Sequence, residues 1–453
     1  MKYDAIIIGA GLGGLSAGAY LARAGKKVLV LEKMSEPGGR CRSVEIMDHR
    51  FDIGADYFGK KILNIYAELG KKKELDPVWF RVIARHGNSS MTIPTGLHTF
   101  RDFHGMGMNT GEIGKLGLRM GGQIMFNRYR KISGYAELVN RITENRNLRE
   151  IFNVGAFFSG NNPENMPSHW FNLVFGRTYG YDRPFIPRAG SGRLPELLAS
   201  VIRENGGGIV YNAQPDRIII RDGRARGILL EGREIEAENV VSGTGILNTV
   251  YSLAEKKDFP PEFLNTLGYY KEGFSMASVF TVFKRDAKIT PGAHIYAMFP
   301  ASVAGMFRVI RDGSFPEDNM FLISVPDAAY GTAGEHMAGT IKFLVPKGAV
   351  SKEAIEAEAG KIMGRVDSLI PGFSDSVVNS RLYTPADYAA NFGFTSSVSP
   401  VAESVHYEKM STATPVAGLY CVGSTVLPVG GCTASSILSG RAAARLIIKN
   451  GGN

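Results

Sequence analysis

The residues at positions 9–14 have the types and spacing of a phosphate-binding glycine turn, Gly-x-Gly-x-x-Gly. The first glycine makes a tight turn, the second lets the backbone approach a pyrophosphate, and the third allows a helix to pack closely on a strand. The N-terminus of that helix then faces the phosphates. The pattern therefore predicts dinucleotide binding by Gly9, Gly11, Leu12, Gly13 and Gly14.

An acidic residue follows about 20 positions after the glycines, where a carboxylate can bind both hydroxyls of a ribose. This residue is Glu32, and Lys33 beside it joins the candidate cofactor-binding residues. The carboxylate would repel a 2′-phosphate, so NADP is disfavoured at this site.

A strand, a turn, a helix and a second strand must position these groups. Residues 4–8 form an apolar strand-like run, residues 15–24 have helical apolar spacing, and residues 28–31 form the second run. The letters around Ser16 also match the Gly-x-Ser-x-Gly of serine hydrolases. Ser16 falls inside the predicted helix, however, and not on the sharp turn that such a nucleophile needs.

Two further segments separate a flavin site from a nicotinamide site: Gly-Gly-Arg at 38–40 and Phe-Asp-Ile-Gly at 51–54. Together with the glycine turn and the acid, they make the chain similar to the FAD-dependent superfamily of phytoene desaturases, retinol saturases, protoporphyrinogen oxidases and amine oxidases. The phytoene desaturase-like branch is the nearest. The resemblance implies FAD, with Gly39 and Arg40 at its phosphates and Gly54 and Ala55 near the flavin ring. A guanidinium fork also matches phosphate oxygens.

The C-terminal region resembles the part of the family that closes the flavin site. A short strand runs into glycine at 418–424, and a Gly-Gly-Cys-Thr-Ala segment at 430–434 precedes a helix predicted over 435–449. The serine after the strand stands where many members carry an acid, and this departure favours the desaturase branch. A covalent flavin link to the cysteine is disfavoured, because it lies after the strand. The resemblance implies cofactor contacts by Gly423, Ser424, Cys432, Thr433 and Ala434.

The middle of the chain alternates between the two expected domains. A helix to about residue 205 precedes strands at 209–211 and 217–220, and the resemblance places Arg217 and Ile218 beside the adenine. Further strands are predicted at 225–230, 234–237 and 240–241.

The expected fold class is α/β: the resemblance implies a Rossmann-like FAD-binding domain of glutathione reductase type 2 with an inserted α+β substrate-binding cap. We expect helices at 112–131 and 135–144 in the cap, and strands at 275–283, 294–299, 320–325 and 340–345 in an open antiparallel sheet. The FAD-binding domain is expected to comprise residues 1–60, 190–250 and 377–453, and the cap residues 61–189 and 251–376.

Composition and charge limit the remaining classes. The chain has 453 residues, of which 44% are hydrophobic, and a formal net charge of +9, which together describe a globular basic protein. The basic residues fit a solvated surface or attraction to an anionic membrane surface, while no nucleic-acid-binding pattern is present. No apolar run is long enough to span a bilayer and no signal peptide is readable. The cytoplasm is the expected location, with the inner face of a membrane as the alternative.

Three cysteines without a paired spacing and eight scattered histidines predict reduced thiols and no metal site.

The function that we expect is hydride transfer between flavin N5 and a C–C bond of an apolar, isoprenoid-type substrate, in the desaturating or saturating direction. Such a step requires no particular acid or base, and Asp56 and Tyr57 are the candidate polar residues beside the flavin. The alternatives are an amine or porphyrinogen oxidase that uses oxygen, and an FAD-binding protein without turnover. Electrons could pass to a quinone or another acceptor, and the sequence leaves the substrate, the direction of transfer and the oligomeric state open.

Overall fold

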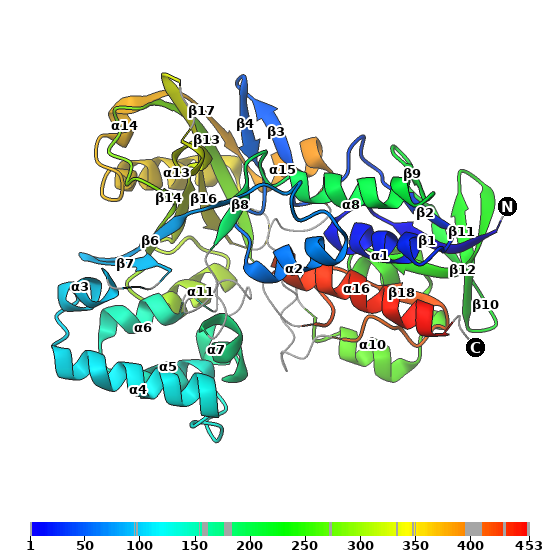
Figure 1. The fold of residues 1–453 in the computed structure, drawn as a ribbon, viewed down its shortest axis with the longest axis horizontal. Coiled ribbons are helices and arrows are strands. Elements are labelled where there is room, and N and C mark those ends of the chain that lie inside the picture. The colour runs from blue at the N-terminus through cyan, green and yellow to red at the C-terminus, as the bar shows by residue number, and fades with distance from the viewer. Residues whose placement is uncertain are drawn as a thin grey trace.

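A computed structural model describes residues 2–94, 96, 98–153, 155, 162–175, 184–270, 274–331, 334–346, 348, 350–394, 410–428 and 432–450. Two large sheets lie at opposite ends of the molecule, with the N- and C-termini both at the end of the first sheet (Figure 1).

The first sheet has a parallel core that continues into an antiparallel meander. Its strand order is β10-β11-β12-β1-β2-β9, and β18 pairs with β12. The pairs among β18, β12, β1, β2 and β9 are parallel, whereas β10, β11 and β12 pair antiparallel. The strands are β1 (Tyr3–Ile8), β2 (Val28–Leu31), β9 (Gly208–Val210), β10 (Arg217–Arg221), β11 (Arg224–Leu230), β12 (Arg233–Ser242) and β18 (Leu419–Cys421).

The strands predicted at 234–237 and 240–241 are a single strand in the structure. The first half of β12 completes the meander by pairing with β11, and its second half pairs with β1. The first half of β12 is largely exposed and mostly polar, whereas its second half is buried and apolar, so the sequence pattern changes within one strand and predicts two.

Helices pack beside this sheet, and the two that lie closest to each other, α1 and α16, are rich in small residues. Helix α1 (Leu12–Arg23) lies against α16 (Cys432–Asn450) and α8 (Arg193–Glu204), with α2 (Lys60–Glu68) nearby (Figure 1). Gly440 allows the approach of α16, because a Cβ atom there would lie 2.2 Å from the carbonyl oxygen of Gly13. The buried core between these helices and the parallel strands includes Ile7, Leu15, Leu198 and Ile437.

The second sheet has the order β17-β13-β16-β15-β14-β6-β7. It is antiparallel, as expected, except that β14 and β6 pair in parallel. Its strands are β6 (Arg81–His86), β7 (Ser89–Ile93), β13 (Ser275–Lys284), β14 (Ala293–Phe299), β15 (Phe321–Ser324), β16 (His336–Val345) and β17 (Val377–Tyr383). Residues 377–383, expected in the FAD-binding domain, thus belong to the sheet of the cap.

The other elements connect and cover the two sheets. Short ribbons pair β3 (Ser43–Ile46) with β4 (His49–Asp52) and β5 (Pro77–Trp79) with β8 (Phe185–Pro187). The helical layer at the far end contains α3 (His98–Gly105), α4 (Thr110–Phe126), α5 (Tyr135–Ile142), α6 (Arg146–Asn153), α7 (His169–Val174) and α11 (Val303–Arg311). The remaining helices are α9 (Ile246–Asn248), α10 (Pro261–Leu267), α12 (Pro326–Tyr330), α13 (Lys352–Val366), α14 (Phe373–Ser376) and α15 (Pro385–Phe392), with single turns at Pro163–Asn165, Thr249–Leu253 and Lys256–Asp258.

The helix predicted over 112–131 ends earlier, because Asn127 adopts the left-handed conformation that terminates α4.

Candidate functional site

The glycine turn has the geometry that its sequence predicts. Gly9 has a φ of +95°, and a Cβ atom at Gly14 would lie 2.1 Å from the carbonyl oxygen of Gly9, so strand and helix meet without room for a side chain. At Gly11, in contrast, no atom lies within 4 Å of the Cβ position. The turn therefore leaves open space where a phosphate would approach, at the N-terminus of α1, whose first turn carries no acid.

Glu32 follows β2 directly and its buried carboxylate is held against the turn. Its Oε2 accepts a hydrogen bond from the backbone N–H of Ala10 at 2.7 Å, and its Oε1 accepts one from the N–H of Met34 at 3.0 Å. These bonds fix the carboxylate beside the glycines. The ammonium of Lys33 donates to the carbonyl of Gly393.

The Gly-Gly-Arg segment runs alongside the turn. The N–H of Gly38 donates to the carbonyl oxygen of Ala10 at 2.8 Å, and a Cβ atom at Gly39, whose φ is +55°, would lie 3.4 Å from the Cα atom of Gly11. Gly54 packs on the backbone of Arg40, where a Cβ atom would lie 1.9 Å from the carbonyl oxygen. The N–H of Ala55 donates to the same oxygen at 3.3 Å. The segment expected at the phosphates (Gly39 and Arg40) therefore lies directly against the segment expected at the flavin ring (Gly54 and Ala55).

The C-terminal residues close the same site. A Cβ atom at Gly13 would lie 2.9 Å from the backbone nitrogen of Gly423, and that nitrogen donates to Ser439 Oγ at 2.8 Å. Ser424 is buried after β18, and Thr433 and Ala434 are half-buried in the first turn of α16. The glycines at 430–431 and the side chain of Cys432 lie outside the described residues.

Arg217 and Ile218 begin β10, in the antiparallel meander of the first sheet. Ile218 is buried in the meander, where it pairs with Ile228. A segment that precedes β10 contacts Glu32: the N–H of Ala213 donates to the carbonyl oxygen of Glu32 at 2.9 Å. The structure thus brings the segment at 212–213 beside Glu32, and the adenine contact at Arg217 and Ile218 stays a prediction.

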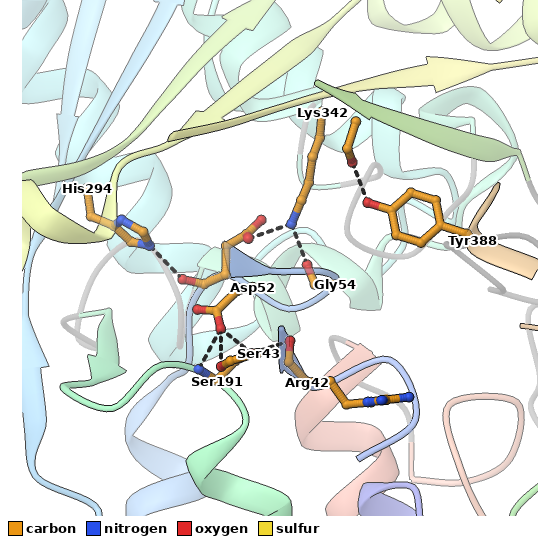
Figure 2. A network of polar contacts seen from close by, with 10 residues as sticks. Arg42, Ser43, Asp52, Gly54, Ser191, His294, Lys342 and Tyr388 are labelled. Atoms are coloured by element: carbon orange, nitrogen blue, oxygen red, sulfur yellow. Dashed lines mark hydrogen bonds and ion pairs between the residues drawn. The ribbon is translucent and has the colours of Figure 1, made fainter. Parts of the chain in front are cut away.

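A buried ion pair holds the loop after Gly54, and sequence reasoning missed one of its members. Lys342, on β16, places its ammonium 2.5 Å from a carboxylate oxygen of Asp56 and 2.7 Å from the carbonyl oxygen of Gly54 (Figure 2). The two charged side chains are only 4% and 10% exposed. A lysine within an otherwise apolar buried strand was the available signal.

His294 holds the same loop from β14. Its Nε2 lies 2.9 Å from the carbonyl oxygen of Asp56 and donates to it, while its Nδ1 makes no hydrogen bond in the described part of the chain. Burial lowers the pKa of His294, with the charge of Asp56 acting in the opposite direction. Burial thus favours the neutral imidazole. His294 on β14 and Lys342 on β16 hold the loop from two strands of the second sheet (Figure 2).

Asp52 anchors the strand that leads into this loop. Its Oδ1 accepts hydrogen bonds from Ser43 Oγ at 2.5 Å and from the N–H and Oγ of Ser191, both at 2.9 Å. Burial raises the pKa of Asp52, and these hydrogen bonds partly offset the rise. Tyr57, the other polar candidate, is half-buried against the core of the first domain.

A second guanidinium lies near the glycine segments. Arg42 is 7% exposed, pairs with Glu36 at 3.3 Å, and has Nε and Nη1 atoms without hydrogen-bond partners among the described residues. Buried donors of this kind suit an anion. Together with the open space at Gly11, they fit a dinucleotide cofactor.

In the part of the chain that the structure describes, no group of three or more His, Cys, Asp or Glu residues is arranged to hold a metal. Ser16 is fully buried in α1 and donates to the carbonyl oxygen of Ile437, as its position inside the helix predicts.

Comparison with known proteins places these motifs in a wider group. Residues 7–69 match a family model described as an NAD(P)-binding Rossmann-like domain. The chain is 25% identical to a neurosporene-forming phytoene desaturase of Rhodobacter capsulatus, across 98% of this chain and 93% of that protein. It is 26% identical to an all-trans-retinol 13,14-reductase of Danio rerio, across 61% of this chain and 53% of that protein.

Solved structures share the fold. An oxidoreductase from Methanosarcina mazei superposes with a TM-score of 0.72 at 19% identity, covering 98% of this chain and 100% of the other. Cyclohexylamine oxidase from Brevibacterium oxydans superposes with a TM-score of 0.65 at 14% identity, covering both chains fully.

Proposed function

The chain is an oxidoreductase of the superfamily that contains phytoene desaturases, retinol reductases and amine oxidases. On this premise we propose that it uses FAD to move a hydride between flavin N5 and one carbon of a C–C bond in an apolar, isoprenoid-type substrate. The adjacent carbon loses a proton to solvent in desaturation, or gains one from solvent in saturation. The observation that carries the proposal is the contact between segments from both ends of the chain. Gly13 of the glycine turn lies against the backbone of Gly423, and Gly39 lies against Gly11 of the same turn, where a dinucleotide would bind.

The residues of the turn would hold the cofactor phosphates through backbone N–H groups, and Glu32 would bind the ribose. Arg40 is the proposed phosphate ligand from the first motif, and the buried donors of Arg42 add a second cation. The start of α16, with Thr433 and Ala434, would place a helix dipole near negative charge on the ring. Ala55 and Ser424 complete the proposed contacts.

Asp56 and Tyr57 take different proposed roles. The carboxylate of Asp56 is committed to Lys342, which makes it a residue that positions the loop. Tyr57 remains the candidate polar group beside the substrate. The protein's part in the reaction is then to orient the substrate and exclude water.

An apolar substrate suits the cap. Met276, Met306 and Met320 share one apolar cluster between the second sheet and the helices, and methionine side chains adapt to irregular ligands. An apolar substrate of this class partitions into bilayers, so we include peripheral membrane contact and an acceptor such as a quinone in the proposal. Among the described residues, no helix combines the length and apolar character needed to cross a bilayer.

The experiment is an anaerobic visible spectrum of the flavin-loaded protein, with isoprenoids in liposomes or with amines. Bleaching of the oxidised flavin bands by an isoprenoid supports desaturation. Bleaching by amines alone overturns it in favour of an oxygen-using oxidase, a candidate that the shared fold with cyclohexylamine oxidase keeps open. If neither bleaches the bands, re-oxidation of chemically reduced flavin by polyenes tests the saturating direction, and its absence rejects the proposal. Absence of bound flavin after reconstitution with FAD rejects the cofactor.

A further inference from the structure

The exposed side chains in the second half of α4 are apolar, which is the reverse of what a helix on a water-exposed surface shows. Leu118 and Met125 lie two turns apart on this side, and they are 74% and 71% exposed. Phe126 at the end of the helix is 77% exposed. These are the three most exposed large hydrophobic side chains among the described residues. The glycines at 114, 117 and 121 face open space and add no polar group.

This surface is held in a defined shape. The opposite side of α4 is buried through Ile113, Leu116 and Gln123. The amide of Gln123 donates to Asn127 Oδ1 at 2.9 Å and accepts from the N–H of Tyr129 at 2.9 Å, which fixes the turn after the helix. Figure 1 shows α4 along the outer edge of the helical layer. The exposed apolar side chains are therefore presented by an ordered helix end.

Positive charge surrounds the apolar side chains. Between Glu112 and Glu137 the chain contains no acidic residue, but it carries five basic ones: Lys115, Arg119, Arg128, Arg130 and Lys131. Arg119 pairs with Glu144 at 3.4 Å, whereas Arg128, Arg130 and Lys131 are exposed in the turn that follows Phe126. Apolar residues that can enter a bilayer interface, next to cations that attract anionic headgroups, are the features of a helix that lies in a membrane surface.

We propose that Leu118, Met125 and Phe126, with Arg128, Arg130 and Lys131, form a docking surface for an anionic lipid bilayer. The three apolar side chains enter the interfacial region, and the three basic ones remain at the headgroups. This inference takes the membrane contact of the proposed function to a named surface. Its test needs no turnover, so it can fail or succeed independently of the reaction.

The test is co-sedimentation of the flavin-loaded protein with vesicles of phosphatidylcholine alone or mixed with phosphatidylglycerol. We expect at least tenfold stronger binding to the anionic vesicles and a decrease with salt. The triple variant Leu118→Ser/Met125→Ser/Phe126→Ser should lose at least tenfold on anionic vesicles. The double variant Arg128→Gln/Arg130→Gln should lose several-fold and become less sensitive to salt.

Matched controls use sites outside this surface. Val378→Ser removes an apolar side chain that is 53% exposed, and Lys72→Gln/Lys73→Gln removes two exposed charges, so both should bind like the wild type. Vesicle binding of the triple serine variant at the wild-type level, or a wild type that binds neither kind of vesicle, would overturn the proposal.

Sedimentation velocity without lipid tests the alternative occupant of this surface, a second copy of the chain. A dimer that the triple variant dissociates, with vesicle binding unchanged, would make the surface an interface between copies.

Discussion

Lys342 Nζ lies 2.7 Å from the carbonyl oxygen of Gly54, although Lys342 is on β16 of the second sheet and Gly54, 288 positions earlier, is in the loop after β4. The same ammonium pairs with Asp56, so one side chain of the cap fixes the loop that would carry the flavin ring. A displacement of the cap sheet relative to the first sheet would therefore also move or break the contacts of Lys342 with this loop.

Replacement of Lys342 by methionine should destabilise the protein by about 3–5 kcal/mol, because it leaves the carboxylate of Asp56 buried without a partner. Urea unfolding of the flavin-free protein measures the loss. Lys352→Met removes the exposed partner of Glu356 and should change stability by less than about 1 kcal/mol.

The double variant Lys342→Met/Asp56→Asn should recover part of the loss, since no buried charge then lacks a partner. Equal stability of the single and double variants would contradict the ion pair as the cause.

Glu32→Gln should weaken FAD binding by about 10-fold to 100-fold, the usual effect of losing a hydrogen bond to a charged group. The amide keeps an oxygen for one of the two backbone N–H groups, so the fold should persist. Fluorescence titration of the flavin-free protein with FAD gives the affinity. Glu45→Gln, at an exposed position on β3, should bind as the wild type does. Unchanged affinity in Glu32→Gln would remove this residue from the cofactor site.

Gly440→Ala should cost about 1–3 kcal/mol or more, because the added methyl group meets the backbone of α1 and α16 must move away. Thermal and urea unfolding report the change. Gly364→Ala on α13 introduces the same methyl group where no atom lies within 4 Å, and should be neutral or stabilise by up to about 1 kcal/mol. Equal effects at the two sites would be inconsistent with close packing of α1 on α16.

His294→Gln should flatten the pH dependence of stability below about pH 6.5, the ordinary pKa of an unfolded histidine. Because burial lowers the pKa of His294, the unfolded chain takes up a proton that the folded protein resists, and wild-type stability falls as the pH falls through this window. The glutamine cannot titrate and still offers an N–H to Asp56. The pKa of Asp52 is raised and acts in the opposite sense, but it is common to both proteins. Urea unfolding at about pH 7.5 and pH 5.5 compares them; parallel losses would refute the neutral histidine.

Local patterns were enough to predict the cofactor-binding framework. The turn at Gly9, the helix after it and the acid at Glu32 lie within a few dozen residues, and each follows from strand and helix periodicity or from what glycine alone allows. The same reasoning placed most strands of both sheets near their observed positions, because buried strands are continuous apolar runs.

Tertiary structure alone decided which distant segments meet. Nothing near Lys342 in the chain shows that it faces Asp56, and nothing near Gly440 shows that it touches Gly13, because these contacts depend on how two sheets and two helices pack. The hydrogen bond from Ala213 to Glu32 likewise joins two segments that are 181 positions apart in the chain. The sequence by itself predicted dinucleotide binding through the short-range backbone geometry of the glycine turn. The buried charges that hold the loop after Gly54 and the exposed apolar side chains of α4 depend instead on long-range packing, so only the tertiary structure decided them.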